Sequence, residues 1–323
     1  MSVRAATADP LRRALLSMLA AWMSERYFRT FRVAEREGEG EGFDAVLTQR
    51  ERRVGVTVGA LWEDADAVPG VPGFGEELAA DLGAAADAGY AIWVPPGAEL
   101  PVEEPRRSQL RLALARGLAG LEPGERREVR LPVTLKLAKI QDDGAYVSVS
   151  GALSREWTRI SEGVSGAFHL DARALHRLPS EPAEVDIVVS RVRDRAALLH
   201  AGELTDVQVH DYWTVSMLPA DAPPGVAVIA APPGVDPEDG TVVRRQFRRH
   251  VTRAVEQRRG GRSDLAVLVL VAALGHIEEE LATAALRGMN PAAYGALDLI
   301  ALAADGRMRQ VLQPRALPWE QPR

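Results

Sequence analysis

The sequence of 323 residues contains no cysteine. This absence excludes disulfide bonds, thiolate nucleophiles, and zinc or iron–sulfur sites with cysteine ligands. It also agrees with a reducing compartment, so we expect a cytoplasmic protein. Lysine is nearly absent as well, because Lys136 and Lys139 are the only two. The first 135 residues therefore contain no lysine that could act as a catalytic cation.

Long hydrophobic runs are also missing. The apolar stretch 14–23 follows Asp9 and Pro10 and is flanked by arginine, which favours a soluble helix over a signal peptide. The run 265–274 has about half of the ~20 residues needed to span a bilayer. We therefore expect no membrane-spanning segment. The abundance of arginine, alanine, glycine and proline is typical of a GC-rich bacterial genome.

The net charge of −6 argues against a surface that is cationic throughout. Positive charge is concentrated in residues 241–262, where eight arginines and one acid give +7. Apolar residues at helical spacing predict an amphipathic helix over 241–257. Its basic face can bind the phosphates of a nucleic acid or an acidic protein, or it is simply solvated. The candidate binding residues are Arg244, Arg245, Arg248, Arg249 and Arg253.

The length predicts two or three domains. Hydrophobic periodicity divides the chain into an α/β region (1–122), a mostly β region (123–218) and a second α/β region (219–323). In the first region we expect a helix from Asp9 to about Tyr27, an extended segment 29–35, a hairpin 42–61, a helix from Gly75, a strand 90–94 and a helix 108–118.

The other two regions have equally distinct patterns. In the middle region we expect a hairpin formed by strands 128–140 and 145–149 around the turn 142–144, further strands at 185–192 and 207–217, and a short helix at 171–178. In the third we expect a strand at 226–230, a helix 241–257, a strand 265–271, a helix 277–286 and a hairpin 297–312. Residues 42–47 resemble residues 296–301, which leaves open a degenerate internal duplication.

Asp44 is the main candidate site residue of the first region. It begins the second predicted strand, and a polar turn separates it from the apolar strand Val54-Gly55-Val56-Thr57-Val58. With Glu25 on the first helix, this order resembles the PD-(D/E)xK nuclease superfamily over roughly residues 9–121. The resemblance implies a restriction-endonuclease-like αβββαβ core and an overall α/β (α+β) class.

The resemblance also implies a catalytic pattern that this chain lacks. In the family, an aspartate and a glutamate hold a divalent metal, and a lysine two residues after the glutamate positions or activates water. Only Asp44 matches, because the strand that should carry Glu-x-Lys reads Val56-Thr57-Val58. Residues two apart share one face of a strand, so the pair would be Gly55 with Thr57 or Thr57 with Gly59. Neither pair can bind a metal and supply a cation.

We therefore expect a non-catalytic binding or scaffold protein that engages a nucleic acid or protein partner without a cofactor. The alternative is a divergent nuclease that uses Mg²⁺ or Mn²⁺, with Asp44 as metal ligand and a relocated acid such as Glu63 or Glu25. Glu35 and Glu37 are further candidates, although their glycine-rich surroundings indicate a surface loop. Asp44 has a simpler interpretation too, as a residue that caps the start of a strand.

Overall fold

The computed structural model describes residues 3–34, 42–62, 68–83, 87–232, 240–272 and 285–319. The chain forms two compact units. Unit 1 contains Met1–Arg127 and Thr214–Arg323, and unit 2 contains Glu128–Trp213. Helices and two mixed sheets are present, so the expected α/β class is confirmed. The division differs from the three expected regions, because the first and third regions lie in the same unit.

A six-stranded sheet organises unit 1, in the order β1-β2-β3-β10-β11-β12. Its strands are β1 (Arg32–Val33), β2 (Ala45–Gln49), β3 (Arg52–Ala60), β10 (Leu265–Val271), β11 (Leu299–Ala304) and β12 (Arg307–Leu312). β10 runs parallel to both β3 and β11, with Val56 opposite Val267. β2 and β12 pair antiparallel with β3 and β11, so the hairpins predicted at 42–61 and 297–312 are confirmed.

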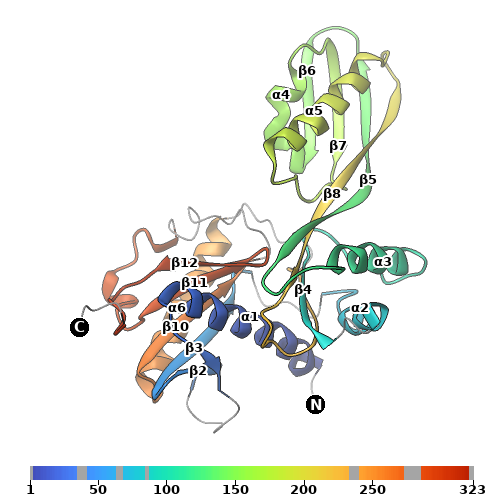
Figure 1. The fold of residues 1–323 in the computed structure, drawn as a ribbon. Coiled ribbons are helices and arrows are strands. Elements are labelled where there is room, and N and C mark those ends of the chain that lie inside the picture. The colour runs from blue at the N-terminus through green and yellow to red at the C-terminus, as the bar shows by residue number, and fades with distance from the viewer. Residues whose placement is uncertain are drawn as a thin grey trace. The chain divides into compact units, whose positions relative to one another are not determined.

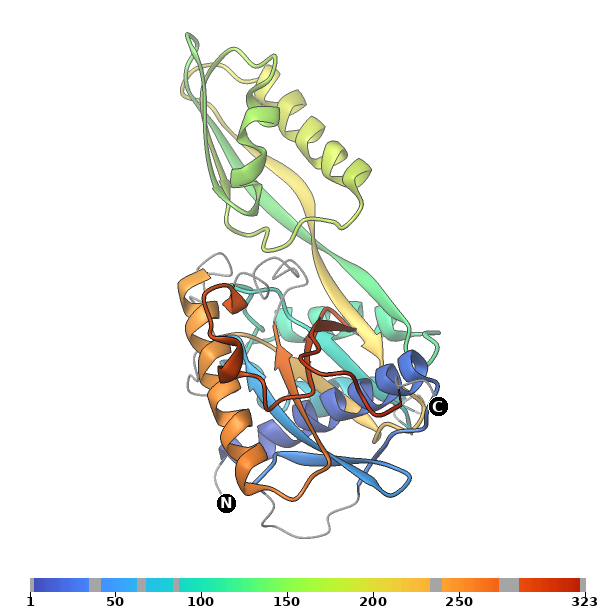
Figure 2. The ribbon, with the colours of Figure 1, turned by 90° about the vertical axis from the view of Figure 1, so that its left-hand side faces the viewer.

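Two helices cover the faces of this sheet, α1 (Val3–Tyr27) on one side and α6 (Gly240–Gly260) on the other (Figures 1 and 2). All seven residues of β10 are buried, as expected for an apolar strand with both faces covered. Val267 and Val269 pack in the cluster of α1, whereas Leu268 and Leu270 pack in the cluster of α6. The helix predicted at 241–257 is therefore confirmed. The helix predicted from Asp9 to Tyr27 is present, but it begins earlier, at Val3, and contains Pro10.

The remaining elements of unit 1 are β4 (Gly89–Trp93), β9 (Gly225–Ile229), α2 (Phe74–Leu82) and α3 (Arg106–Leu118). β4 pairs in parallel with β9 and antiparallel with the end of β8 (Leu204–Met217). Trp93 and Ile229 join the same hydrophobic cluster as Leu15 and Leu19 of α1. α1 is therefore packed on two sides, which explains why residues 14–20 are all buried.

The expected αβββαβ core is not contiguous in sequence. The second helix and fourth strand were expected near Gly75 and at 90–94, and both elements exist as α2 and β4. However, β4 belongs to the second sheet, and the strand beside β3 is β10. The elements that follow β3 around its own sheet are thus α6 and β10, with residues 61–239 inserted between β3 and α6.

Unit 2 contains part of the second sheet, whose six strands have the order β6-β7-β5-β8-β4-β9, and has helices of its own. Its elements are β5 (Arg126–Gln141), β6 (Ala145–Gly151), η2 (Ala152–Glu156), α4 (Trp157–Ser161), β7 (Gly166–Ala172), α5 (Pro182–Ala197) and most of β8. β7 pairs in parallel with β6 and antiparallel with β5. β5 and β8 continue from unit 2 into unit 1 and carry the chain between them.

Three predictions in the middle region were wrong. The expected strands 128–140 and 145–149 exist as β5 and β6, but they do not form the predicted hairpin, because β7 lies between them in the sheet. The expected strand 185–192 lies within α5, where Val188, Val189 and Val192 are buried at helical spacing and Pro182 occupies the first turn. The expected helix 171–178 is absent from this described stretch, since residues 171–172 end β7 and no helix begins before Pro182. The helix expected at 277–286 falls largely outside the described residues. No described helix is long and apolar enough to cross a membrane.

Candidate functional site

Asp44 lies at the start of β2 and is held by contacts from three elements. Its backbone N–H donates to the Val56 carbonyl at 3.0 Å, and its carbonyl accepts from the Arg12 guanidinium of α1 at 3.1 Å. One carboxylate oxygen accepts the Val58 backbone N–H at 2.8 Å. The other oxygen forms an ion pair with Arg253 of α6. The Asp44 side chain is 20% exposed, so the carboxylate is mostly covered by these partners.

The ion pair joins two residues that the sequence suggested separately. Arg253 belongs to the basic segment, yet its guanidinium contacts the carboxylate of Asp44 and also donates to the Val58 carbonyl at 3.4 Å. The cation beside Asp44 therefore comes from the helix that covers the sheet, rather than from β3. Sequence reasoning missed this contact because the two residues are 209 positions apart.

The face of β3 that lies against α6 is filled by side chains. A Cβ atom added at Gly55 would lie 2.5 Å from the Phe43 ring, and one at Gly59 would lie 2.3 Å from the His250 ring. Between these positions, the Thr57 hydroxyl bonds to Gln257 of α6. The space in which a Glu-x-Lys pair would extend is occupied by two rings and an amide.

A divalent metal does not fit this arrangement. Mg²⁺ and Mn²⁺ need several converging oxygen ligands, usually with more than one carboxylate. Among the residues that the structure describes, no three or more His, Asp or Glu side chains are grouped closely enough to hold a metal. A cation at Asp44 would also have to displace the Arg253 guanidinium.

The structure does not bring Glu25 to Asp44. Arg12 touches Asp44, and Glu25 lies more than three turns further along α1, about 20 Å away along the helix axis. Glu25 lines a pocket with Thr48 and Arg50, at the opposite end of the β2–β3 hairpin. Glu63, Glu35 and Glu37 lie outside the described residues.

The outer side of α6 carries the basic residues predicted for binding. Val243, Phe247, Val251 and Ala254 face the sheet and are buried. On the opposite side the guanidinium-bearing residues are exposed in two successive pairs: Arg244 and Arg245, then Arg248 and Arg249. Arg253 forms an ion pair with Asp44, and its side chain is 42% exposed.

No family model, curated protein or solved structure matches the chain.

Asp211 is a buried aspartate in unit 2. It accepts two hydrogen bonds from His176, through the backbone N–H and the ring Nδ1, both at 3.0 Å. It also accepts the Arg177 backbone N–H at 2.8 Å and the Trp213 indole N–H at 3.0 Å. Four donors satisfy this carboxylate, which indicates a structural role in fixing the chain before α5.

Proposed function

We propose that this chain is a non-catalytic binding protein of the bacterial cytoplasm, in which the exposed arginine face of α6 binds nucleic acid. The observation that carries the proposal is the Arg253–Asp44 ion pair. It neutralises the only carboxylate that matches the nuclease pattern, and it anchors the basic helix to the sheet. Arg244, Arg245, Arg248 and Arg249 of α6 are exposed on the outer surface.

The order of elements supports a scaffold of the nuclease type. α1, β1, β2, β3, α6 and β10 follow one another in the order αβββαβ, once the insertion 61–239 is set aside. The sheet also has one helix on each face. Because Phe43, His250 and Gln257 fill the catalytic face of β3, this scaffold supports binding rather than hydrolysis.

The distribution of charge favours a polyanion as the partner. Arg244 and Arg248 are four residues apart, which is ~6 Å along the helix axis, so their guanidinium groups can reach neighbouring phosphates. Residues 241–262 carry +7 in a chain whose net charge is −6, so the rest of the protein is acidic and repels nucleic acid. This contrast directs a nucleic acid to α6. An acidic protein surface is the competing partner.

The test is a binding titration with a labelled 20-base-pair duplex over a range of salt concentrations. We expect the triple variant R244A/R248A/R249A to bind more weakly and to lose up to about 2.7 from the slope of log K against log salt, at about 0.9 per phosphate contact. A control variant, R106A/R116A/R195A, removes three exposed arginines from α3 and α5. Equal behaviour of the two triple variants would exclude α6 as the contact surface, and co-purification would then identify a protein partner.

A cleavage assay tests the non-catalytic part of the proposal separately. The protein is incubated with plasmid, linear duplex and single strands in Mg²⁺ or Mn²⁺. We expect no protein-dependent cleavage. Robust cleavage that Asp44→Ala abolishes would instead establish the divergent metal-dependent nuclease.

A further inference from the structure

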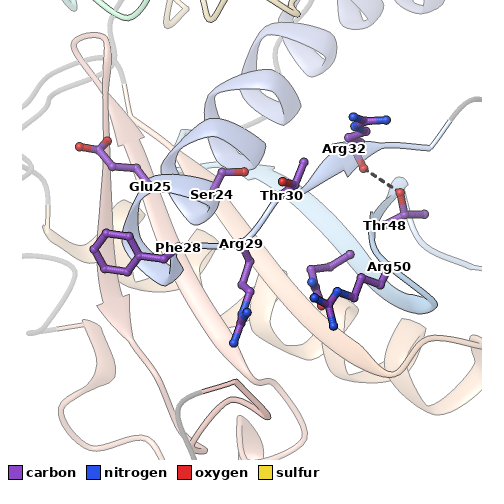
Figure 3. Close-up of a pocket in the computed structure, with 9 residues that line it drawn as sticks. Ser24, Glu25, Phe28, Arg29, Thr30, Arg32, Thr48 and Arg50 are labelled. Carbon is purple, nitrogen blue, oxygen red and sulfur yellow. Dashed lines mark hydrogen bonds between the residues drawn. The ribbon is translucent and has the colours of Figure 1, made fainter.

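A second basic site lies at the end of the β2–β3 hairpin that is remote from Asp44. It is an open pocket with a volume of about 810 Å³ (Figure 3). Three segments of unit 1 form it: the C-terminal turn of α1, the loop that leads to β1, and the hairpin turn. The lining residues that matter here are Glu25, Phe28, Arg29, Arg32, Thr48 and Arg50.

Phe28 lines this pocket although its ring is exposed to solvent and its backbone is strained. Its side chain is 91% exposed, so its ring gains almost nothing from burial. It follows the last residue of α1 and has a φ of +51°, in the left-handed region. Glycine or asparagine is normally found at this helix-ending position, because a larger side chain is strained there.

The hairpin turn shows the same departure from the usual residue. Arg50 has a φ of +55° at a turn position that favours glycine or asparagine. Within the described ranges only three non-glycine residues have a positive φ, and two of them, Phe28 and Arg50, line this pocket. Strained backbone of this kind tends to gather at functional sites.

The charges of the pocket are suited to phosphate. Arg29, Arg32 and Arg50 are exposed, and none of them forms an ion pair within the described part of the chain. Figure 3 shows Arg29 and Arg50 extending from different segments toward the same side, with Phe28 beyond Arg29. Glu25 lies beside Phe28, so a phosphate is disfavoured at that end of the pocket and a neutral base is favoured.

We infer that this pocket binds single-stranded nucleic acid, with an unpaired base stacked on the Phe28 ring and the adjoining phosphates on Arg29 and Arg50. A duplex has no base free to stack on the Phe28 ring, because its bases are already stacked on one another. An acidic peptide can form ion pairs with the arginines but has no base to stack on the ring. Stacking on an aromatic side chain within a basic groove is how proteins hold single strands without reading their sequence.

This inference deepens the proposed function, on which it rests for the class of polymer, but it uses residues outside α6. The first experiment measures the affinity of the full chain for a labelled 12-nucleotide single strand. We expect Phe28→Ala to weaken binding roughly 5- to 150-fold, the range for loss of one stacked base. The salt slope should not change, because no charge is lost. R29A/R50A should instead lower the slope by about 1.4, at about 0.7 per single-strand phosphate contact.

Three further variants separate stacking from folding. Phe28→Trp keeps a ring and should keep the affinity, whereas Tyr146→Ala removes a ring that is 65% exposed in unit 2 and should have no effect. Phe28→Gly relieves the left-handed strain, so it should raise the melting temperature while weakening single-strand binding as much as Phe28→Ala. Wild-type affinity in a stable Phe28→Gly variant would overturn the inference.

Comparison with the α6 variant tells the two proposals apart. Duplex binding that depends on Arg244, Arg248 and Arg249, combined with single-strand binding that ignores Phe28, overturns this inference and leaves the proposed function standing. Single-strand binding that depends on Phe28 supports the inference even if α6 is not a contact surface. Absence of binding to both polymers overturns both.

Discussion

Removal of either partner of the Arg253–Asp44 ion pair should have unequal effects on stability. Asp44→Ala deletes the acceptor of the Val58 N–H, and a partly buried donor left without an acceptor costs about 1–3 kcal/mol. It also deletes the ion pair, which we value at about 1 kcal/mol because the Arg253 side chain is 42% exposed. We therefore expect Asp44→Ala to lower the free energy of unfolding by roughly 2–4 kcal/mol and Arg253→Ala by about 1 kcal/mol.

Asp44→Asn and a double-mutant cycle isolate these contributions. The asparagine oxygen can still accept the Val58 N–H, so this variant should lose only the ionic part, about 1 kcal/mol. In the cycle, Arg253→Ala should cost almost nothing once Asp44 is alanine, which gives a coupling energy of about 1 kcal/mol. Arg248→Ala is the matched control, since Arg248 is exposed on the same helix and should change stability by less than about 0.5 kcal/mol.

Urea unfolding at pH 7, with and without Mn²⁺, provides the measurements. The reasoning is refuted if the coupling energy is near zero, or if Arg253→Ala is as destabilising as Asp44→Ala. It is also refuted if Mn²⁺ raises the unfolding midpoint of the wild type in a way that requires Asp44. That result would mean that the carboxylate prefers a metal to the guanidinium.

Two other predictions follow from packing and charge. Gly59→Ala should lower the free energy of unfolding by about 1–3 kcal/mol, because the added Cβ would lie 2.3 Å from the His250 ring. Gly260→Ala is the control: its added Cβ would meet nothing within 4 Å, so this variant should be neutral or stabilising in the same assay. Hydrogen bonds from Arg107 and then Arg111 lower the pKa of Glu77 to about 2. Glu77→Gln should therefore lower the free energy of unfolding at pH 7 by about 1 kcal/mol, after allowance for solvent screening. Because the folded pKa lies below the ordinary value of 4.5, this stabilisation is complete above about pH 4.5 and disappears as the pH falls toward 2. The wild type and Glu77→Gln should therefore converge in stability in acid.

Local elements of the fold could be predicted from the sequence because their signals are local. The seven-residue apolar run of β10 and the 3.6-residue periodicity of α6 identify these elements without any knowledge of their neighbours. The prediction of a strand in place of α5 was wrong because valine is common in β strands. The valines of α5 have helical spacing, and this spacing lets them pack together against the sheet of unit 2.

Pairing between distant segments could not be predicted in the same way. Nothing in β3 itself indicates that its neighbour is β10 rather than β4, since all three are short and apolar. The candidate site shows the same limit: the strand position of Asp44 and the basic character of α6 are visible in the sequence, but their contact through Arg253 depends on that pairing. The exposure and backbone strain of Phe28 have no sequence signal, because a phenylalanine after a helix is ordinarily expected in the core.

The insertion between β3 and α6 has a consequence for the order of folding. Unit 2 is continuous in sequence and can form as soon as it leaves the ribosome, whereas β3 must wait for β10 across a separation of about 200 residues. At 5–20 residues per second this delay is on the order of 10–40 s. During synthesis, the β3 edge of the future sheet therefore remains unpaired while unit 2 is completed. Ribosome-bound chains that end before β10 should consequently be the aggregation-prone species of this protein, and its yield should depend on chaperones that shield that edge.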